Sequence, residues 1–208
     1  MPCMGDLRDE EVELVQQTVD LPSGALRLWL LREAAELPDV AGVEWAPVAP
    51  YWAILWRSSV ALAHELERID MRGLRVVELG CGLAVPSIAA ARAGAVALAT
   101  DIRPEALELV ARNAALNQVP VETALVDWAA PDDLIRRAPF DLVLASDVLY
   151  ERASFSLLLS LLPRLAPEAL VADPGRPAGD AFMEQANRRW RVETHDRGVV
   201  AIHRLKLG

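Results

Sequence analysis

The residues best suited to bind a cofactor form the run Glu78-Leu79-Gly80-Cys81-Gly82-Leu83-Ala84, directly after a predicted strand at residues 75–79. Gly80 and Gly82 lack a Cβ atom, so the backbone here can approach a ligand closely and adopt positive φ angles without penalty. In an open parallel sheet, ligands bind beyond the carboxyl ends of the strands. The run is therefore predicted to be a cofactor-binding loop.

Asp101 is the second candidate, because it ends the next predicted strand and lies 23 residues after Glu78. An acidic residue at about this spacing holds ribose hydroxyls in folds of this kind. The alternative is that Asp101 caps the predicted helix that begins near Pro104. One carboxylate can serve both purposes, and we expect Asp101 and the following Ile102 to contact the cofactor.

Dinucleotide binding is the main competing interpretation, since it uses the same crevice. Its fingerprint needs Gly-x-Gly-x-x-Gly, and the third glycine position is occupied here by Val85. A bulky side chain at this contact between helix and strand disfavours a grip on pyrophosphate. S-adenosylmethionine has no pyrophosphate, so the sequence favours this methyl donor, with S-adenosylhomocysteine as product.

Asp127 and Trp128 follow the third predicted strand and are expected to meet the adenine, the first through its amino group and the second through the ring. The alternative for Trp128 is that it only covers the edge of the sheet. For Cys81, packing of a small side chain is favoured over a role as nucleophile, because buried cysteines are usually inert.

These residues need a scaffold, and the pattern from residue 75 onward alternates short apolar runs with longer helical stretches. This alternation predicts an α/β fold: a doubly wound, mainly parallel seven-stranded sheet with the last strand antiparallel and helices on both faces. The predicted strands cover residues 75–79, 95–100, 121–126, 140–146, 169–172, 191–194 and 199–205, and the predicted helices cover 85–93, 104–117, 154–165 and 179–188.

The first part of the chain is organised differently. Residues 12–19 and 25–31 favour strands and flank the turn Leu21-Pro22-Ser23-Gly24, which predicts a hairpin. Residues 36–50 contain three prolines and a glycine and are expected to form a loop, whereas 51–69 show the spacing of an amphipathic helix. We expect residues 1–50 to be an extension of a domain that covers 51–208.

Composition limits the class of protein. The chain has 208 residues, 53% hydrophobic content and a formal net charge of −9, which argues against binding to the phosphate backbone of nucleic acids. An acidic start and the lack of a long apolar run predict no leader and no membrane span. Two cysteines and three isolated histidines predict no disulfide framework and no metal site. A cytoplasmic protein is expected.

With these residues in view, the chain resembles the seven-β-strand methyltransferases that modify lysine side chains of non-histone proteins. Within them it is most similar to the lysine methyltransferases of the electron-transfer flavoprotein β-subunit. The resemblance rests on four segments: Pro50-Tyr51-Trp52-Ala53-Ile54-Leu55-Trp56, Val77-Glu78-Leu79-Gly80-Cys81-Gly82, Ser146-Asp147-Val148-Leu149-Tyr150 and Asp173-Pro174-Gly175-Arg176-Pro177.

The resemblance implies roles for individual residues. Asp147 is expected to orient the substrate ammonium and Tyr150 to form a wall of its channel, as the catalytic pair, while Trp52 adds an aromatic face to the substrate site. The predicted cofactor-binding residues are Trp56, Glu78, Gly80, Cys81, Gly82, Asp101, Ile102, Asp127, Trp128 and Ser146. The sequence departs from the family's common Gly-x-Gly-x-Gly at Ala84.

Two other functions remain open at this point. A small-molecule N-methyltransferase would use the same cofactor domain, and a silent binding module would keep the fold without activity. The short first part of the chain offers little material for a lid, which favours a protein substrate. Arg176 and the arginines at 188, 189 and 191 are interpreted either as a rim for an acidic partner or, more economically, as solvated surface.

Overall fold

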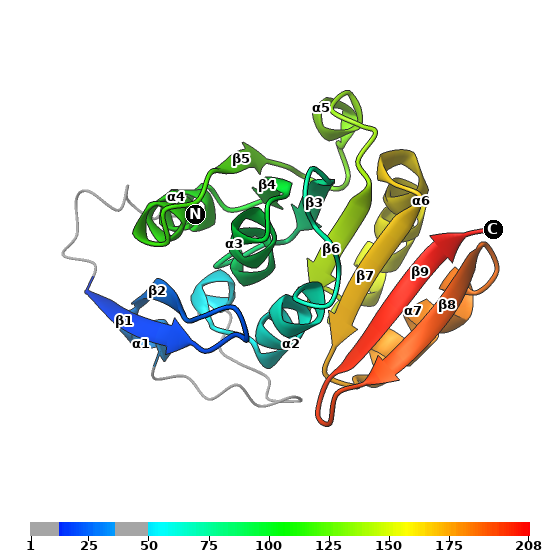
Figure 1. The fold of residues 1–208 in the computed structure, drawn as a ribbon. Helices are drawn as coiled ribbons and strands as arrows, with labels where there is room; N and C mark the ends of the chain where they lie inside the picture. Colours follow the sequence, from blue (N-terminus) through cyan, green and yellow to red (C-terminus); the bar gives the residue numbers. More distant parts are fainter. Residues whose placement is uncertain (1–12, 36–49) are drawn as a thin grey trace, which may run out of the picture.

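The computed structural model describes residues 13–35 and 50–208, and its centre is a seven-stranded sheet. Strands follow the order β5-β4-β3-β6-β7-β9-β8, and all neighbours are parallel except for the two pairs that involve β9 (Figure 1). The predicted fold class is thus confirmed, including the antiparallel last strand. The strands are β3 (Arg75–Leu79), β4 (Val96–Asp101), β5 (Val121–Leu125), β6 (Leu142–Ser146), β7 (Glu168–Asp173), β8 (Trp190–Asp196) and β9 (Ala201–Leu207).

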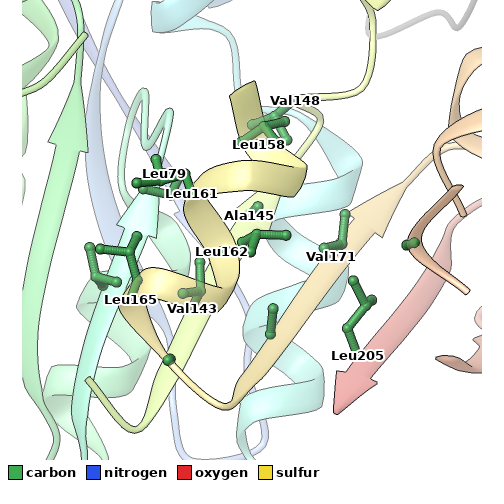
Figure 2. Packing of buried hydrophobic residues seen from close by; sticks show 14 of the residues in the cluster. Leu79, Val143, Ala145, Val148, Leu158, Leu161, Leu162, Leu165, Val171 and Leu205 are labelled. Atoms are coloured by element: carbon green, nitrogen blue, oxygen red, sulfur yellow. The ribbon is translucent and has the colours of Figure 1, made fainter. Parts of the chain in front are cut away.

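Helices cover both faces of this sheet, each over its own apolar core (Figure 1). On one face lie α2 (Arg57–Leu66), α3 (Val85–Arg92) and α4 (Pro104–Leu116). The other face carries α6 (Phe155–Leu165) and α7 (Pro177–Ala186), with the short α5 (Asp132–Ile135) nearby. Figure 2 shows how α6 turns a row of leucines toward the sheet: Leu158, Leu161, Leu162 and Leu165, against Val143, Ala145 and Val171. Both faces of the sheet are therefore shielded from solvent, as a parallel sheet requires.

The predicted N-terminal hairpin is present as β1 (Leu14–Val19) and β2 (Leu26–Leu31), followed by the short α1 (Arg32–Ala35). Its β2 strand is bonded to α4 through two asparagines one turn apart. Asn113 accepts from the Trp29 amide (2.7 Å) and donates to the Trp29 carbonyl (3.2 Å). Asn117 repeats this pattern at Arg27. The hairpin thus shares the core of the main sheet, and the boundary near residue 50 stays a prediction.

One predicted helix is wrong in its first third. The expected helix at 51–69 is instead the 3-10 turn η1 (Tyr51–Ala53), an extended link and then α2. Ile54 is buried in extended conformation, and the Trp56 indole donates to the Tyr51 carbonyl (3.0 Å). Burial and this hydrogen bond outweigh the helical spacing. The structure also adds η2 (Arg152–Ser154), and α7 begins and ends two residues earlier than expected.

Two predictions concern residues outside the described ranges. The expected loop at 36–50 falls there except for its last residue, and so does Val12 at the predicted start of the hairpin. Within 13–35 and 50–208, no helix is long and apolar enough to cross a membrane.

Candidate functional site

The predicted cofactor loop lies at the carboxyl edge of the sheet, and its two glycines are needed sterically. Gly80 and Gly82 have φ angles of 63° and 50°. A Cβ atom on Gly82 would lie 2.7 Å from the Trp52 carbonyl oxygen, and one on Gly80 would lie 3.1 Å from Val148 and 3.3 Å from the Trp128 ring. The loop is therefore closely packed by two predicted site residues, Trp52 and Trp128. The loop can adopt this shape because glycine carries no side chain at these two positions.

Asp101 ties this loop to the end of β4. Its Oδ2 accepts a hydrogen bond from the Gly82 amide (3.0 Å), and its Oδ1 accepts one from the Arg103 amide (3.0 Å) just before α4. Burial raises the pKa of the Asp101 carboxyl above its ordinary value. Asp101 is 8% exposed, while the adjacent Ile102 is 61% exposed and presents an apolar side chain at the same edge. The Asp101 carboxylate bonds to no amide of α4, whose N-cap is Arg103, so it braces the loop and the turn before the helix and does not cap the helix itself.

Glu78 is fully buried beneath the loop. Its Oε2 accepts hydrogen bonds from the Ser87 amide (2.9 Å) and the Ser87 hydroxyl (2.5 Å), both in the first turn of α3. Its Oε1 has no hydrogen-bond partner among the described residues. Burial raises the pKa of Glu78 to about 8. A buried acceptor without a donor needs an explanation, and a ligand's donor group is one.

Cys81 and Ala84 complete the inner side of the loop. Cys81 is buried, and burial raises the pKa of its thiol well above the ordinary value. The thiol packs in an apolar cluster with Ala84, Ala99 and Val110, so its surroundings favour packing over nucleophilic chemistry. Ala84 adopts the left-handed conformation with φ 56°, in which glycine is ordinarily preferred.

Substitution of the two small residues of the loop should change stability to different extents. Gly82→Ala should lower the free energy of unfolding by about 2–3 kcal/mol, because the new Cβ meets the Trp52 carbonyl and the backbone is left-handed. Ala84→Gly should change it by less than about 1 kcal/mol. Glycine at position 84 relieves the strain of the left-handed backbone, which raises the free energy of unfolding. The loss of a buried methyl group and the greater flexibility of the unfolded chain lower it by a similar amount. Urea titration of both variants measures this, and equal destabilisation would contradict it.

Asp147 lies directly after β6 and is held by two other elements. Its backbone is left-handed with φ 59°, and its side chain is buried. Oδ2 accepts from the Ser58 hydroxyl at the start of α2 (3.0 Å), and Oδ1 pairs with the Arg176 guanidinium. The next residue, Val148, touches the position of Gly80 in the cofactor loop. Non-glycine residues held in this conformation cluster at functional sites.

Three residues that contact or surround Asp147 are absent from the predicted site: Ser58, Asp173 at the end of β7 and Arg176 at the start of α7. Arg176 was interpreted from the sequence as rim or solvated surface, yet its side chain is 19% exposed and paired with Asp147. The available signal was the Asp-Pro-Gly-Arg segment, which was noted only as a resemblance. Gly179 in α7 allows this arrangement, since a Cβ there would lie 2.6 Å from the Asp173 Oδ1.

The other predicted site residues lie around the cofactor loop and Asp147 and differ in how deeply they are buried. Tyr150 is 69% exposed, and Asp127 is exposed with its Oδ1 accepting from the Ala129 amide (2.8 Å). Ser146 is buried at the last position of β6. Trp56 is half-buried and bonded to the Tyr51 carbonyl. Among the residues that the structure describes, no group of three or more His, Cys, Asp or Glu side chains could hold a metal ion.

The site fits a ligand that carries hydroxyl groups, an ammonium group and an aromatic ring. The glycine backbone without Cβ atoms, the Asp101 carboxylate and the exposed Ile102 supply matching surfaces, and the unpartnered Glu78 Oε1 lies buried beneath the loop. The fold and this site define a class I S-adenosylmethionine-dependent methyltransferase. The methyl donor carries all three kinds of group.

Comparison with known proteins then identifies the family. The lysine methyltransferase family matches residues 36–187, and the chain belongs to it. It is 35% identical to the protein N-lysine methyltransferase METTL21A of Danio rerio over 55% of each chain. It is 34% identical to the electron transfer flavoprotein beta subunit lysine methyltransferase of Xenopus laevis over 77% of this chain and 67% of that one.

A solved structure supports the fold. The 16S rRNA N2 G1207 methyltransferase RsmC of T. thermophilus, in complex with AdoMet and guanosine, superposes with a TM-score of 0.65 at 14% identity. The match covers 94% of this chain and 51% of RsmC. The chain also spans only about half the length of the METTL21A relative. The resemblance inferred from the four sequence segments is thus confirmed at the level of the family.

Proposed function

We propose that this protein transfers the methyl group of S-adenosylmethionine to lysine side chains of another protein, the electron transfer flavoprotein β-subunit or a similar one. The observation that carries the proposal is the position of Asp147. Its carboxylate is fixed between Ser58 and Arg176, and Val148 connects it to the cofactor loop at Gly80. A cation-binding carboxylate beside a methyl-donor site suits an amine substrate.

The reaction is an in-line displacement, in which the amine nitrogen bonds to the methyl carbon as the carbon–sulfur bond breaks. The cofactor supplies the activated methyl group, so the protein contributes mainly by positioning. A lysine amine must be neutral to react, and its ordinary pKa is about 10.4. Asp147 orients the incoming ammonium, and the exposed Tyr150 and the half-buried Trp52 form walls of the channel. Desolvation in that channel lowers the amine's pKa.

A protein substrate is favoured over a small molecule by the surroundings of this edge. Tyr150 and Ile102 are exposed, and a groove of about 670 Å³ runs along α2 from Arg57, next to Ser58, to Arg68. Arg197 from the β8–β9 turn also lines the groove. Arg68 and Arg197 pair with Glu65 within this groove, so the groove offers a partner mainly its shape and the apolar side chains of Leu55, Val60 and Val199. We place this reaction in the cytoplasm.

Transfer of labelled methyl from S-adenosylmethionine tests the proposal. The labelled donor is incubated with purified electron transfer flavoprotein and, separately, with a cell lysate, and mass spectrometry locates the label. Label on lysines of the flavoprotein β-subunit supports the whole proposal, and label on lysines of another protein keeps the reaction but discards the substrate. Tight cofactor binding without any protein label would favour the small-molecule function, and failure to bind the cofactor would favour a silent module.

Asp101→Asn should weaken S-adenosylmethionine binding by about tenfold or more. The neutral amide keeps one acceptor but turns an N–H group toward one of the two backbone donors, Gly82 or Arg103, and hydrogen bonds to a charged group are worth about 1.5–3 kcal/mol. Isothermal calorimetry measures the affinity. Asp132→Asn, at an exposed aspartate outside the proposed site, is the matched control and should leave the affinity unchanged. Unchanged affinity of Asp101→Asn would remove Asp101 from the binding site.

A further inference from the structure

Arg176 lies between two buried carboxylates, and its guanidinium donates a hydrogen bond to only one of them. Its guanidinium pairs with Asp147 Oδ1, while Asp173 Oδ2 is 3.9 Å from the same nitrogen. The side chains of Asp147 and Asp173 are only 5% and 2% exposed. A carboxylate oxygen this deeply buried is costly to leave without a donor.

The Asp173 carboxylate is rigidly placed. Its Oδ1 accepts from the Gly175 amide (2.8 Å) and the Arg176 amide (2.9 Å), and Gly179 packs against it closely. Its Oδ2 accepts no hydrogen bond from any described residue. Burial also raises the pKa of this carboxyl above its ordinary value, although the two backbone hydrogen bonds and the Arg176 charge act in the opposite direction. The long Arg176 side chain is the adaptable member of the three.

We propose that Arg176 is a displaceable counter-ion: the substrate ammonium takes its place at Asp147, and the guanidinium moves to the vacant acceptor Asp173 Oδ2. This proposal rests on the proposed function, because it needs an amine at Asp147. The geometry provides both ends of the exchange, an occupied acceptor at Asp147 and an unused one at 3.9 Å. Ser58 keeps Asp147 in place during the exchange through Oδ2 (3.0 Å).

The exchange solves an electrostatic problem of this reaction. Ionised Asp147 and Asp173 with one guanidinium carry a surplus negative charge, which an arriving ammonium neutralises, so the site accepts one cation without leaving a carboxylate unpaired. The guanidinium remains close after its move. A neighbouring positive charge disfavours the protonated amine and promotes the release of its proton to solvent before the methyl group is transferred. Arg176 thus acts as a positioning residue that both admits the amine and favours its neutral form.

The test uses n-butylammonium chloride as a mimic of the lysine side chain, added to the full chain saturated with S-adenosylhomocysteine. Guanidinium NMR signals of Arg176 and the apparent affinity for the probe are measured against sodium chloride at equal ionic strength. Four proteins are compared: wild type, Arg176→Gln, Asp173→Asn and the double variant. Asparagine retains Oδ1 for the two backbone donors but offers an N–H group where the guanidinium should arrive. Calorimetric affinity for S-adenosylhomocysteine verifies folding.

We expect a saturable shift of the Arg176 signal in the wild type. Asp173→Asn should weaken probe binding by about tenfold, the size of one charged hydrogen bond, and Arg176→Gln should strengthen it because no counter-ion competes. In the double variant the Asp173→Asn effect should vanish, since the two residues act as one unit. Weaker binding in Arg176→Gln, or an Asp173→Asn effect that persists without Arg176, would overturn the exchange.

The methyl-transfer assay separates this proposal from the proposed function. If no protein is labelled but the variants bind the probe as expected, only the proposed lysine activity is contradicted. If protein is labelled but the variants do not bind the probe as expected, only the proposed movement of Arg176 is contradicted. Where labelling occurs, Arg176→Gln should also move the rising limb of the pH–rate profile to higher pH, because the amine loses a neighbouring positive charge. Arg176→Lys, which keeps the charge, should leave that limb close to the wild-type position, and an equal shift in both variants would contradict the exchange.

Discussion

Asp147→Asn should lower kcat/KM for the methylated protein by about 100-fold or more while leaving the affinity for S-adenosylmethionine nearly unchanged. Asparagine has the same shape and tolerates the left-handed backbone of φ 59°, so the fold is retained. The variant removes the charge that receives the ammonium. Loss of one partner of a buried charged pair costs about 2–5 kcal/mol.

A graded control uses Ser58, whose hydroxyl donates to the other oxygen of the same carboxylate. Ser58→Ala removes one hydrogen bond without altering the charge and should lower kcat/KM by about three- to tenfold, corresponding to about 0.5–1.5 kcal/mol. Steady-state kinetics of both variants, with calorimetry for the cofactor, gives the comparison. Full turnover in Asp147→Asn would remove Asp147 from the catalytic residues.

The second large effect concerns stability and pH. Glu78 has its pKa raised by burial from 4.5 to about 8, so the folded state holds a proton that the unfolded chain releases above about pH 4.5. The free-energy cost of ionising the buried Glu78 carboxyl is absent below that pH. It grows as the pH rises and reaches its full value above about pH 8. We therefore expect the free energy of unfolding of the cofactor-free protein to fall through this range.

Glu78→Gln should remove that dependence and raise the free energy of unfolding by about 2–4 kcal/mol at pH 9, since one pKa unit corresponds to about 1.4 kcal/mol and the buried amide forfeits part of the gain. At pH 4 the two proteins should differ little. Urea titrations at pH 4, 7 and 9 measure this, with Glu108→Gln on the exposed side of α4 as the control. Equal pH dependence in wild type and Glu78→Gln would contradict the prediction.

The same substitution should weaken cofactor binding, because the unpartnered Glu78 Oε1 becomes an N–H group and no longer accepts a donor. Stability and binding would then change in opposite directions. Such opposition is expected where a buried ionisable group is retained for a ligand at a cost to the free protein. A variant that is more stable and binds equally well would show that Glu78 only anchors Ser87 at the start of α3.

Much of the fold and part of the site follow from local sequence patterns. Strict alternation of short apolar runs with helical stretches predicted the sheet, because burial on both faces leaves continuous apolar strands. The position of Glu78, Gly82 and Asp101 at one edge follows from parallel pairing alone, since strands that run in the same direction end together. These features depend on residues close in sequence and on one rule of topology.

The other features of the fold and the site could be found only in the tertiary structure. The helical spacing of residues 51–69 gave no indication that Ile54 would be buried in an extended link or that Trp56 would bond to Tyr51. In the same way, no local pattern shows that Arg176 reaches Asp147, 29 positions away, or that Ser58 reaches it across 89. The sequence by itself determined the class of fold and the family, and it predicted the cofactor loop. Only packing of distant segments decided the ionic partners of Asp147, because the energies of such contacts depend on burial and distance that composition and spacing do not contain.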